Sequence, residues 1–195
     1  MESPARVSDR VWTVPNAVSF ARLLAIPYFV YLLLARDDPR TAGLLLVVIG
    51  ATDWVDGALA RILNQESELG RKLDPIADRL AIVTAVVAGW LAEIVPGVIA
   101  GPLLLREALM AVVTAGLVAR GKGTLQVRYL GKVATFAVYG SIPSFYLAAA
   151  DVLPAVFRAL GWTAGVIGLA LYWLTAIQYL GDARRLVAAS RGGTG

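Results

Sequence analysis

The chain has 195 residues, of which 58% are hydrophobic and 16% are charged, and its mean hydropathy is +0.68. Because about a quarter of the residues of a typical soluble domain are charged, this composition predicts an integral membrane protein. The chain has no cysteine and no histidine, which excludes disulfides and thiol chemistry and leaves carboxylates, lysine or tyrosine for any acid–base step.

The N-terminal region is expected to lead directly into the first membrane span. Residues 1–14 are polar with spaced apolar residues, so they are expected to form either a short helix in the membrane interface or a disordered tail. The first span is expected at 16–35, where Pro15 suits the first helical turn and Asn16 the helix cap. Arg22 lies inside this span, so its side chain either reaches the lipid headgroups or faces a polar cavity.

The second and third spans are expected at about 41–62 and 72–94, and each carries a pair of aspartates near the same membrane face. The pairs are Asp53 with Asp56 and Asp74 with Asp78. An aspartate at the centre of a membrane helix costs roughly 2.5 to 3.5 kcal/mol, so four would cost on the order of 10 kcal/mol before their mutual repulsion. A cation shared between the two helices would offset this cost.

Carboxylates that converge from two helices form a site of hard oxygen ligands, which suits Mg²⁺ or Mn²⁺. A site with few protein ligands leaves coordination positions for substrate phosphates, so the pattern indicates phosphoryl or phosphatidyl transfer. Gly57 and Gly70 would let a ligand approach the helix backbone, although glycines also serve helix packing. Arg61 is either a bidentate phosphate ligand or a cytoplasmic anchor.

The second half of the chain completes a single domain over 1–195, with a six-helix bundle at 16–180 and a basic tail at 181–195. Three more membrane spans are expected, at about residues 98–119, 133–150 and 155–180. Arg106 and Glu107 fall inside the fourth span. They form either a structural ion pair or part of an acceptor-recognition site.

Six spans place both termini on the same side of the membrane, and the distribution of lysine and arginine assigns that side. The termini and connections expected there hold twelve of these residues, whereas the other side holds three, which are Arg36, Arg40 and Arg158. Both termini and the aspartates are therefore expected to face the cytoplasm, in a multi-pass protein of the cell (inner) membrane. The net charge of +4 is explained by attraction to anionic lipid headgroups, so no nucleic-acid partner is expected.

The stretch from Asp53 to Asp78 has the spacing D-x2-D-G-x2-A-R-x8-G-x3-D-x3-D, and it resembles the signature of the CDP-alcohol phosphatidyltransferase family at every fixed position. The order of hydrophobic segments is similar too, so the resemblance covers nearly the whole chain. It implies a two-metal site held by Asp53, Asp56 and Asp74, with Asp78 as both a ligand and the base that deprotonates the acceptor. It also implies that the cytidine diphosphate part of a CDP-lipid is held by Gly57, Ala60, Arg61 and Gly70.

The acceptor is indicated by a finer resemblance. The run from Asn64 to Arg79 is most similar to the cardiolipin synthase branch, in which CDP-diacylglycerol and phosphatidylglycerol react and CMP is released. The phosphatidylglycerophosphate synthase branch, which uses glycerol 3-phosphate, is the alternative, but it would carry another arginine at the position of Thr114. A phosphorylated acceptor would use that extra cation, so phosphatidylglycerol is favoured. Candidate contacts to lipid phosphate or acceptor are Asn16, Arg22 and Arg106.

Two other classes use aspartates in membranes. Intramembrane prenyltransferases bind diphosphate lipids through Mg²⁺ but would release pyrophosphate rather than CMP. Ion-coupled transporters would be expected to show paired halves or broken helices, and neither is visible in the sequence. A homodimer is implied by family resemblance, and a stripe of small residues on the third span could pack either between protomers or inside one. The stripe consists of Ala85, Ala88, Gly89 and Ala92.

Overall fold

The structure is a computed structural model that describes residues 14–63, 68–121 and 129–189, with side chains described for 20–52, 76–121 and 129–185. All the regular elements in these ranges are helical, which confirms the all-α prediction. The elements in chain order are α1 (Val14–Val30), the π-helical turn η1 (Tyr31–Ala35), α2 (Pro39–Leu63), α3 (Glu68–Leu91), α4 (Gly97–Val118), α5 (Tyr129–Ala149) and α6 (Pro154–Ala189).

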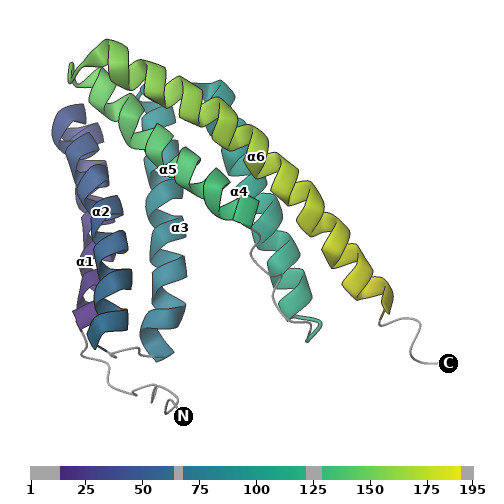
Figure 1. The fold of residues 1–195 in the computed structure, drawn as a ribbon. Helices are drawn as coiled ribbons and strands as arrows, with labels where there is room; N and C mark the ends of the chain where they lie inside the picture. Colours follow the sequence, from purple (N-terminus) through teal and green to yellow (C-terminus); the bar gives the residue numbers. More distant parts are fainter. Residues whose placement is uncertain (1–13, 64–67, 122–128, 190–195) are drawn as a thin grey trace.

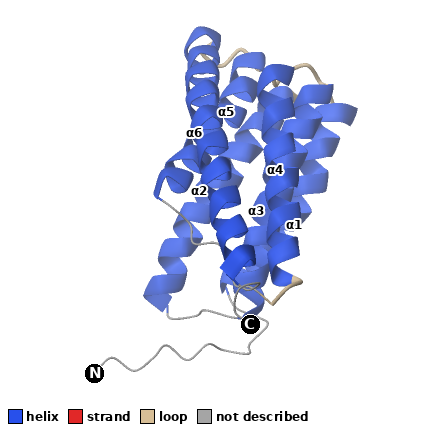
Figure 2. Ribbon diagram, turned by 90° about the vertical axis from the view of Figure 1, so that its right-hand side faces the viewer, coloured by secondary structure: helices blue, strands red, loops and turns tan. Residues whose placement is uncertain are grey.

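The helices run alternately up and down and form one bundle (Figure 1; Figure 2). Helices α1, α2 and α3 stand together on one side, and the long helix α6 crosses the other side with α5 packed along it. The start of α1 and the end of α6 both lie at the lower end of the bundle in Figure 1. The alternating directions of the helices thus bring these two ends of the described chain to the same end of the bundle.

The exterior of the bundle is apolar. Large hydrophobic side chains point outward from several helices, as Leu24 does on α1, Val112 on α4 and Phe136 on α5, whose ring is 83% exposed. Within the described residues, α4 and the Pro154–Arg185 part of α6 are long and apolar enough to cross a membrane. Such a surface is typical of a protein that contacts lipid, whereas the six membrane spans stay a prediction.

Three details of the helix ends differ from the sequence-based expectations. Helix α3 begins at Glu68, before the start expected at residue 72, so Pro75 lies in its interior. Helix α6 continues to Ala189, so Arg184 and Arg185 belong to this helix and not to a tail. Apart from one glycine in each, both extensions consist largely of helix formers, which are glutamate, leucine and arginine on α3 and alanine, leucine and arginine on α6. On α1, Asn16 lies inside the first turn instead of at the cap.

Helix α2 has a well-defined start. Asp38 precedes its first residue, Pro39, and accepts hydrogen bonds from the backbone nitrogen of Thr41 at 3.0 Å and from the Thr41 hydroxyl at 2.6 Å. This is the geometry of an N-cap, with proline at the first helical position. The hydrogen bonds from Thr41 lower the pKa of the Asp38 carboxyl below its ordinary value because they favour the ionised form.

Tyr146 joins three helices in the core. Its side chain is fully buried, its ring packs edge-on against Phe29 of α1 at 5.5 Å between centroids, and its hydroxyl donates a hydrogen bond of 2.7 Å to the carbonyl oxygen of Ala85 on α3. A Cβ built on Gly89 would lie 2.5 Å from this hydroxyl, so α3 needs a residue without a side chain here. The close approach fixes α1, α3 and α5 around the site described below.

The small-residue stripe on α3 packs inside the protomer. Ala85, Ala88 and Gly89 are buried, and Ala92 is packed against the same core. Gly89 faces Tyr146 of α5, which is an intramolecular contact. The stripe therefore gives no support to the homodimer that the sequence analysis implied.

Candidate active site

The two aspartate pairs lie at matching heights on consecutive antiparallel helices. Asp56 and Asp53 lie seven and ten residues before the end of α2, and Asp74 and Asp78 lie six and ten residues after the start of α3. At about 1.5 Å of rise per residue, both pairs are roughly 10 to 15 Å from the connection between the helices. The backbone is thus compatible with one shared site near the lower end of the bundle in Figure 1.

Asp78 is the one predicted metal ligand whose side chain the structure describes. Its carboxylate forms a close ion pair with the guanidinium of Arg22 on α1, where the side chain of Arg22 is 5% exposed and that of Asp78 is 28% exposed. Arg22 therefore does not extend to the lipid headgroups. Of the two orientations considered from the sequence, the structure shows the inward one, in which the guanidinium meets the carboxylate of Asp78.

This ion pair borders a small cavity of about 90 Å³, called here the Asp78 cavity. Apart from Arg22 and Asp78 it is lined mainly by apolar residues of α2, α3 and α5, such as Ile49, Ile82 and Ile142. Arg22 also lines a second small cavity, of about 150 Å³, between α1 and α2. Charged groups in so apolar a setting interact more strongly than at a wet surface.

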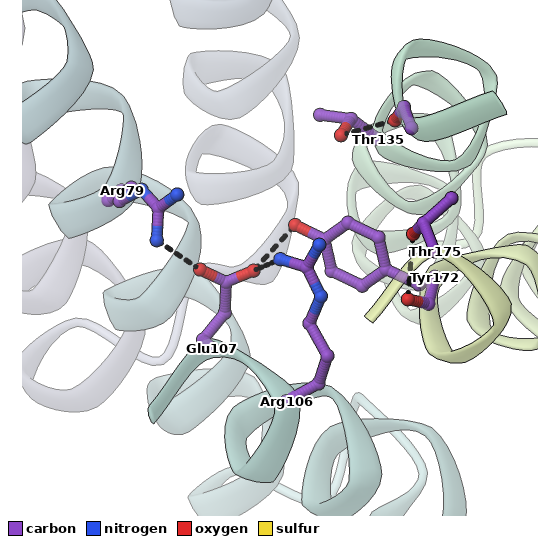
Figure 3. A network of polar contacts seen from close by, with 7 residues as sticks. Arg79, Arg106, Glu107, Thr135, Tyr172 and Thr175 are labelled. Carbon is purple, nitrogen blue, oxygen red and sulfur yellow. Dashed lines mark hydrogen bonds and ion pairs between the residues drawn. The ribbon is translucent and has the colours of Figure 1, made fainter. Parts of the chain in front are cut away.

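A second cluster of polar side chains surrounds Glu107 on α4 (Figure 3). Its carboxylate accepts hydrogen bonds from Arg106 at 2.8 Å, from Arg79 of α3 at 3.1 Å and from the hydroxyl of Tyr172 of α6 at 2.5 Å. Arg106 also stacks on the Tyr172 ring, with its guanidinium carbon 3.6 Å from the centroid. The cluster thus joins α3, α4 and α6, and the ion pair expected between Arg106 and Glu107 is present.

The Glu107 cluster borders a cavity of about 300 Å³, called here the Glu107 cavity. Arg106 is 6% exposed, and its Nε atom is buried without a hydrogen-bond partner. Two guanidinium groups around one carboxylate leave an excess of one positive charge. Hydroxyl groups from three helices complete the polar lining, which includes Thr114, Thr135, Tyr139, Tyr172 and Tyr179. A cavity of this kind suits an anionic group such as a phosphate.

The structure brings together some predicted site residues and separates others. Arg22 meets Asp78, whereas Arg106 lies in the other cavity and pairs with Glu107. Arg79 and Tyr172 complete the Glu107 cluster and were not singled out from the sequence. The structure does not describe the side chains of the remaining predicted residues. These residues are Asn16, Asp53, Asp56, Gly57, Ala60, Arg61, Gly70 and Asp74.

Comparison with known proteins identifies the family. The sequence profile of the CDP-alcohol phosphatidyltransferases matches residues 12–177. The chain belongs to the CDP-alcohol phosphatidyltransferase family. It is 39% identical over 188 residues to the "Cardiolipin synthase (CMP-forming)" of Streptomyces coelicolor, which covers 93% of this chain and 87% of that protein. The family resemblance predicted from the aspartate motif is therefore confirmed.

More distant relatives in the CDP-alcohol phosphatidyltransferase family carry a different name. Proteins named CDP-diacylglycerol–glycerol-3-phosphate 3-phosphatidyltransferase are 28% identical over 189 residues in Shigella flexneri and 32% identical over 142 residues in Bacillus subtilis. These matches cover 92% and 65% of this chain, and 96% and 72% of the relatives. The two acceptor branches considered from the sequence are thus the two branches found among these relatives.

The donor set fits the divalent cation that the family implies. The chain offers only oxygen ligands here, since it has no cysteine or histidine, and such ligands suit Mg²⁺ or Mn²⁺. Among the side chains that the structure describes, no three potential ligands gather in one place. The side chains of Asp53, Asp56 and Asp74 lie outside the described ranges, so these residues stay predicted ligands. The backbone of Asp78, whose side chain is partly exposed, lies at a similar level of the bundle.

Proposed function

We propose that this phosphatidyltransferase joins CDP-diacylglycerol to phosphatidylglycerol and releases CMP. The observation that carries the choice of acceptor is the position of Thr114, which lines the Glu107 cavity together with Arg106. The residue at which the two branches are expected to differ thus lines the cavity where an acceptor phosphate would bind. The similarity to the Streptomyces coelicolor protein supports the same acceptor.

The net charge of the side chains around the Glu107 cavity supports an acceptor that is a phosphodiester. Arg79 and Arg106 together with Glu107 carry a net charge of one, which matches the single negative charge of a phosphodiester such as phosphatidylglycerol. A phosphomonoester such as glycerol 3-phosphate carries about −1.5 to −2 at neutral pH. It would need a further cation, and Thr114 does not provide one.

In the proposed reaction, a headgroup hydroxyl of the acceptor attacks the phosphorus that is attached to diacylglycerol. The bond between this phosphorus and the oxygen that bridges to CMP breaks, CMP leaves, and Asp78 takes the proton of the hydroxyl. A bound divalent cation would neutralise the diphosphate and the charge that develops on CMP. Asp53, Asp56 and Asp74 would hold the metals with Asp78, while Gly57, Ala60, Arg61 and Gly70 would hold the cytidine diphosphate.

The proposed setting is the cell (inner) membrane, with six spans and with both termini and the site at the cytoplasmic surface. Its support is the alternation of the six long helices, which brings the start of α1 and the end of α6 to one end of the bundle. The aspartate pairs lie toward that same end, where a nucleotide headgroup in the aqueous phase could reach them. The excess of lysine and arginine expected at this end agrees with that orientation.

The acceptor is tested by competition. Purified protein in detergent receives CDP-diacylglycerol, Mg²⁺ or Mn²⁺, and equal concentrations of phosphatidylglycerol and glycerol 3-phosphate, and mass spectrometry identifies the lipid products. We expect a product with four acyl chains to dominate. A predominance of phosphatidylglycerophosphate would show that the alternative acceptor is correct. Release of pyrophosphate from an added prenyl diphosphate, with no product from CDP-diacylglycerol, would indicate a prenyltransferase. Activity in detergent without any ion gradient would exclude a purely transport function.

A further inference from the structure

Two consecutive residues of α3 face two different cavities. Asp78 lines the Asp78 cavity beside Arg22, whereas Arg79 lines the Glu107 cavity and reaches Glu107. Under the proposed function, the first cavity holds the base and the second holds the acceptor phosphate. The hydroxyl that reacts must therefore pass from one cavity to the other.

Tyr139 of α5 lies at the boundary of these cavities. Among the residues that the structure describes, it is the one that lines both. Its neighbours hold the backbone in place, because a Cβ built on Gly168 of α6 would lie 2.9 Å from the backbone nitrogen of Val138 and 3.0 Å from the Cβ of Ala137. With the backbone packed so closely against α6, opening of the boundary would require rotation of the Tyr139 side chain.

We infer that the ring of Tyr139 is a partition that keeps the water of the Glu107 cavity away from Asp78 until an acceptor displaces the ring. This inference rests on the proposed function and names a positioning residue for it. The larger cavity is polar and roughly three times the volume of the smaller, so it is the natural reservoir of water next to the base. An enzyme that activates a hydroxyl must prevent water from reacting in its place.

If the Tyr139 ring no longer separated the two cavities, CDP-diacylglycerol would be hydrolysed in a side reaction. Water would attack the phosphorus attached to diacylglycerol, the bond from that phosphorus to the oxygen bridging to CMP would break, and the proton of water would pass to Asp78. The products are phosphatidate and CMP. The ratio of phosphatidate to transferred lipid therefore reports whether water reaches Asp78, and a loss of stability alone would not change this ratio.

The test compares three variants with the wild-type protein in the presence of CDP-diacylglycerol, divalent cation and phosphatidylglycerol. Tyr139→Ala removes the ring, Tyr139→Phe keeps the ring without the hydroxyl, and Phe136→Ala removes a ring on the same helix that is 83% exposed and lines neither cavity. We expect Tyr139→Ala to raise the ratio of phosphatidate to transferred lipid several-fold. Tyr139→Phe and Phe136→Ala should keep the wild-type ratio.

The outcomes distinguish a failure of the proposed function from a failure of the proposed role of Tyr139. A wild-type protein that releases no CMP would overturn the proposed function. An active wild-type protein whose product ratio is unchanged in Tyr139→Ala would overturn the partition alone. Should Tyr139→Ala fail to fold, Tyr139→Leu replaces it, since leucine fills part of the volume without closing the boundary, and the same ratio decides. An increase in phosphatidate with Tyr139→Phe would also contradict a role of the ring.

Discussion

The guanidinium of Arg22 on α1 forms an ion pair with the carboxylate of Asp78 on α3. Residues 56 positions apart in the sequence thus meet at the predicted base of the reaction. The pair ties the position of Asp78 to the first helix. Because the pair is largely buried, its two charges interact more strongly than a surface pair would.

Replacing Asp78 with asparagine should abolish phosphatidyl transfer while CDP-diacylglycerol still binds. Asparagine has nearly the same shape but cannot accept the proton of the acceptor hydroxyl. The measurement is product formation by mass spectrometry beside binding of CDP-diacylglycerol. Asp37→Asn is the control, because Asp37 is exposed and has a left-handed backbone that asparagine tolerates. Full activity of Asp78→Asn would remove Asp78 from the role of base.

Replacing Arg22 with alanine should lower both stability and activity. Removing one partner of a buried ion pair costs roughly 3 to 5 kcal/mol, and we expect the lower end because Asp78 is 28% exposed. Arg22→Lys keeps the charge and should recover part of the loss. The measurements are thermal unfolding in detergent and the transfer rate, with Arg158→Ala on the exposed surface as the control. Equal results for the alanine and lysine variants would argue against a role of the charge.

Removing the carboxylate of Glu107 should destabilise the bundle and weaken acceptor binding. Glu107→Ala leaves the buried guanidinium of Arg106 without its counter-charge, which costs roughly 3 to 5 kcal/mol, whereas the loss at Arg79 is smaller because its side chain is 55% exposed. Glu107→Gln keeps an acceptor oxygen and should cost less. We expect the KM for phosphatidylglycerol to rise more than the KM for CDP-diacylglycerol. A uniform change in both constants, or a change equal to that of exposed Glu93→Gln, would contradict this specific effect.

Introducing an arginine at Thr114 should shift the choice of acceptor. The new guanidinium would enter the Glu107 cavity and add the cation that a phosphomonoester needs. The ratio of kcat/KM for glycerol 3-phosphate to that for phosphatidylglycerol should rise several-fold. Thr114→Val serves as the control, because it alters polarity without adding charge. An unchanged ratio in Thr114→Arg would show that the acceptor phosphate binds elsewhere.

Adding one methyl group at Gly89 should destabilise the core. Its Cβ would lie 2.5 Å from the hydroxyl of Tyr146 and 2.6 Å from Cγ2 of Val95, so Gly89→Ala must displace the tyrosine or the α3–α4 turn. Overpacking of this kind costs about 1 to 3 kcal/mol. Gly140→Ala on α5 is the matched control, since no heavy atom of another described element lies within 4 Å of its added Cβ. Thermal unfolding in detergent should separate the two variants, and equal melting temperatures would contradict the packing described.

The family and the helical fold could be predicted because both depend on patterns between residues that are close in the sequence. The spacing from Asp53 to Asp78 is a short-range pattern, and apolar runs of helical length mark the six long helices. The positions of the helix ends are harder to predict than the helices themselves. Helix α6 continues to Ala189 because helix-forming residues follow its apolar run.

The contacts between helices could not be predicted in the same way. The partner of Arg22 depends on how α1 packs against α3, and the hydroxyl of Tyr172 meets Glu107 only because α6 crosses α4. Nothing in the apolar sequence around Tyr172 distinguishes it from a core residue. Arg79 was available as a charged residue directly after Asp78, but its direction into a different cavity follows from the rotation of consecutive residues around a helix.

The stoichiometry of the reaction tests the central claim most directly. Purified protein is incubated with CDP-diacylglycerol and with phosphatidylglycerol that carries an isotope label in its headgroup, in the presence of Mg²⁺ or Mn²⁺, and CMP and lipids are quantified together. We predict one CMP for each labelled product with four acyl chains, and no such product from Asp78→Asn. CMP release without incorporation of the label, or labelled product from Asp78→Asn at the wild-type rate, would contradict the proposed transfer to phosphatidylglycerol through Asp78.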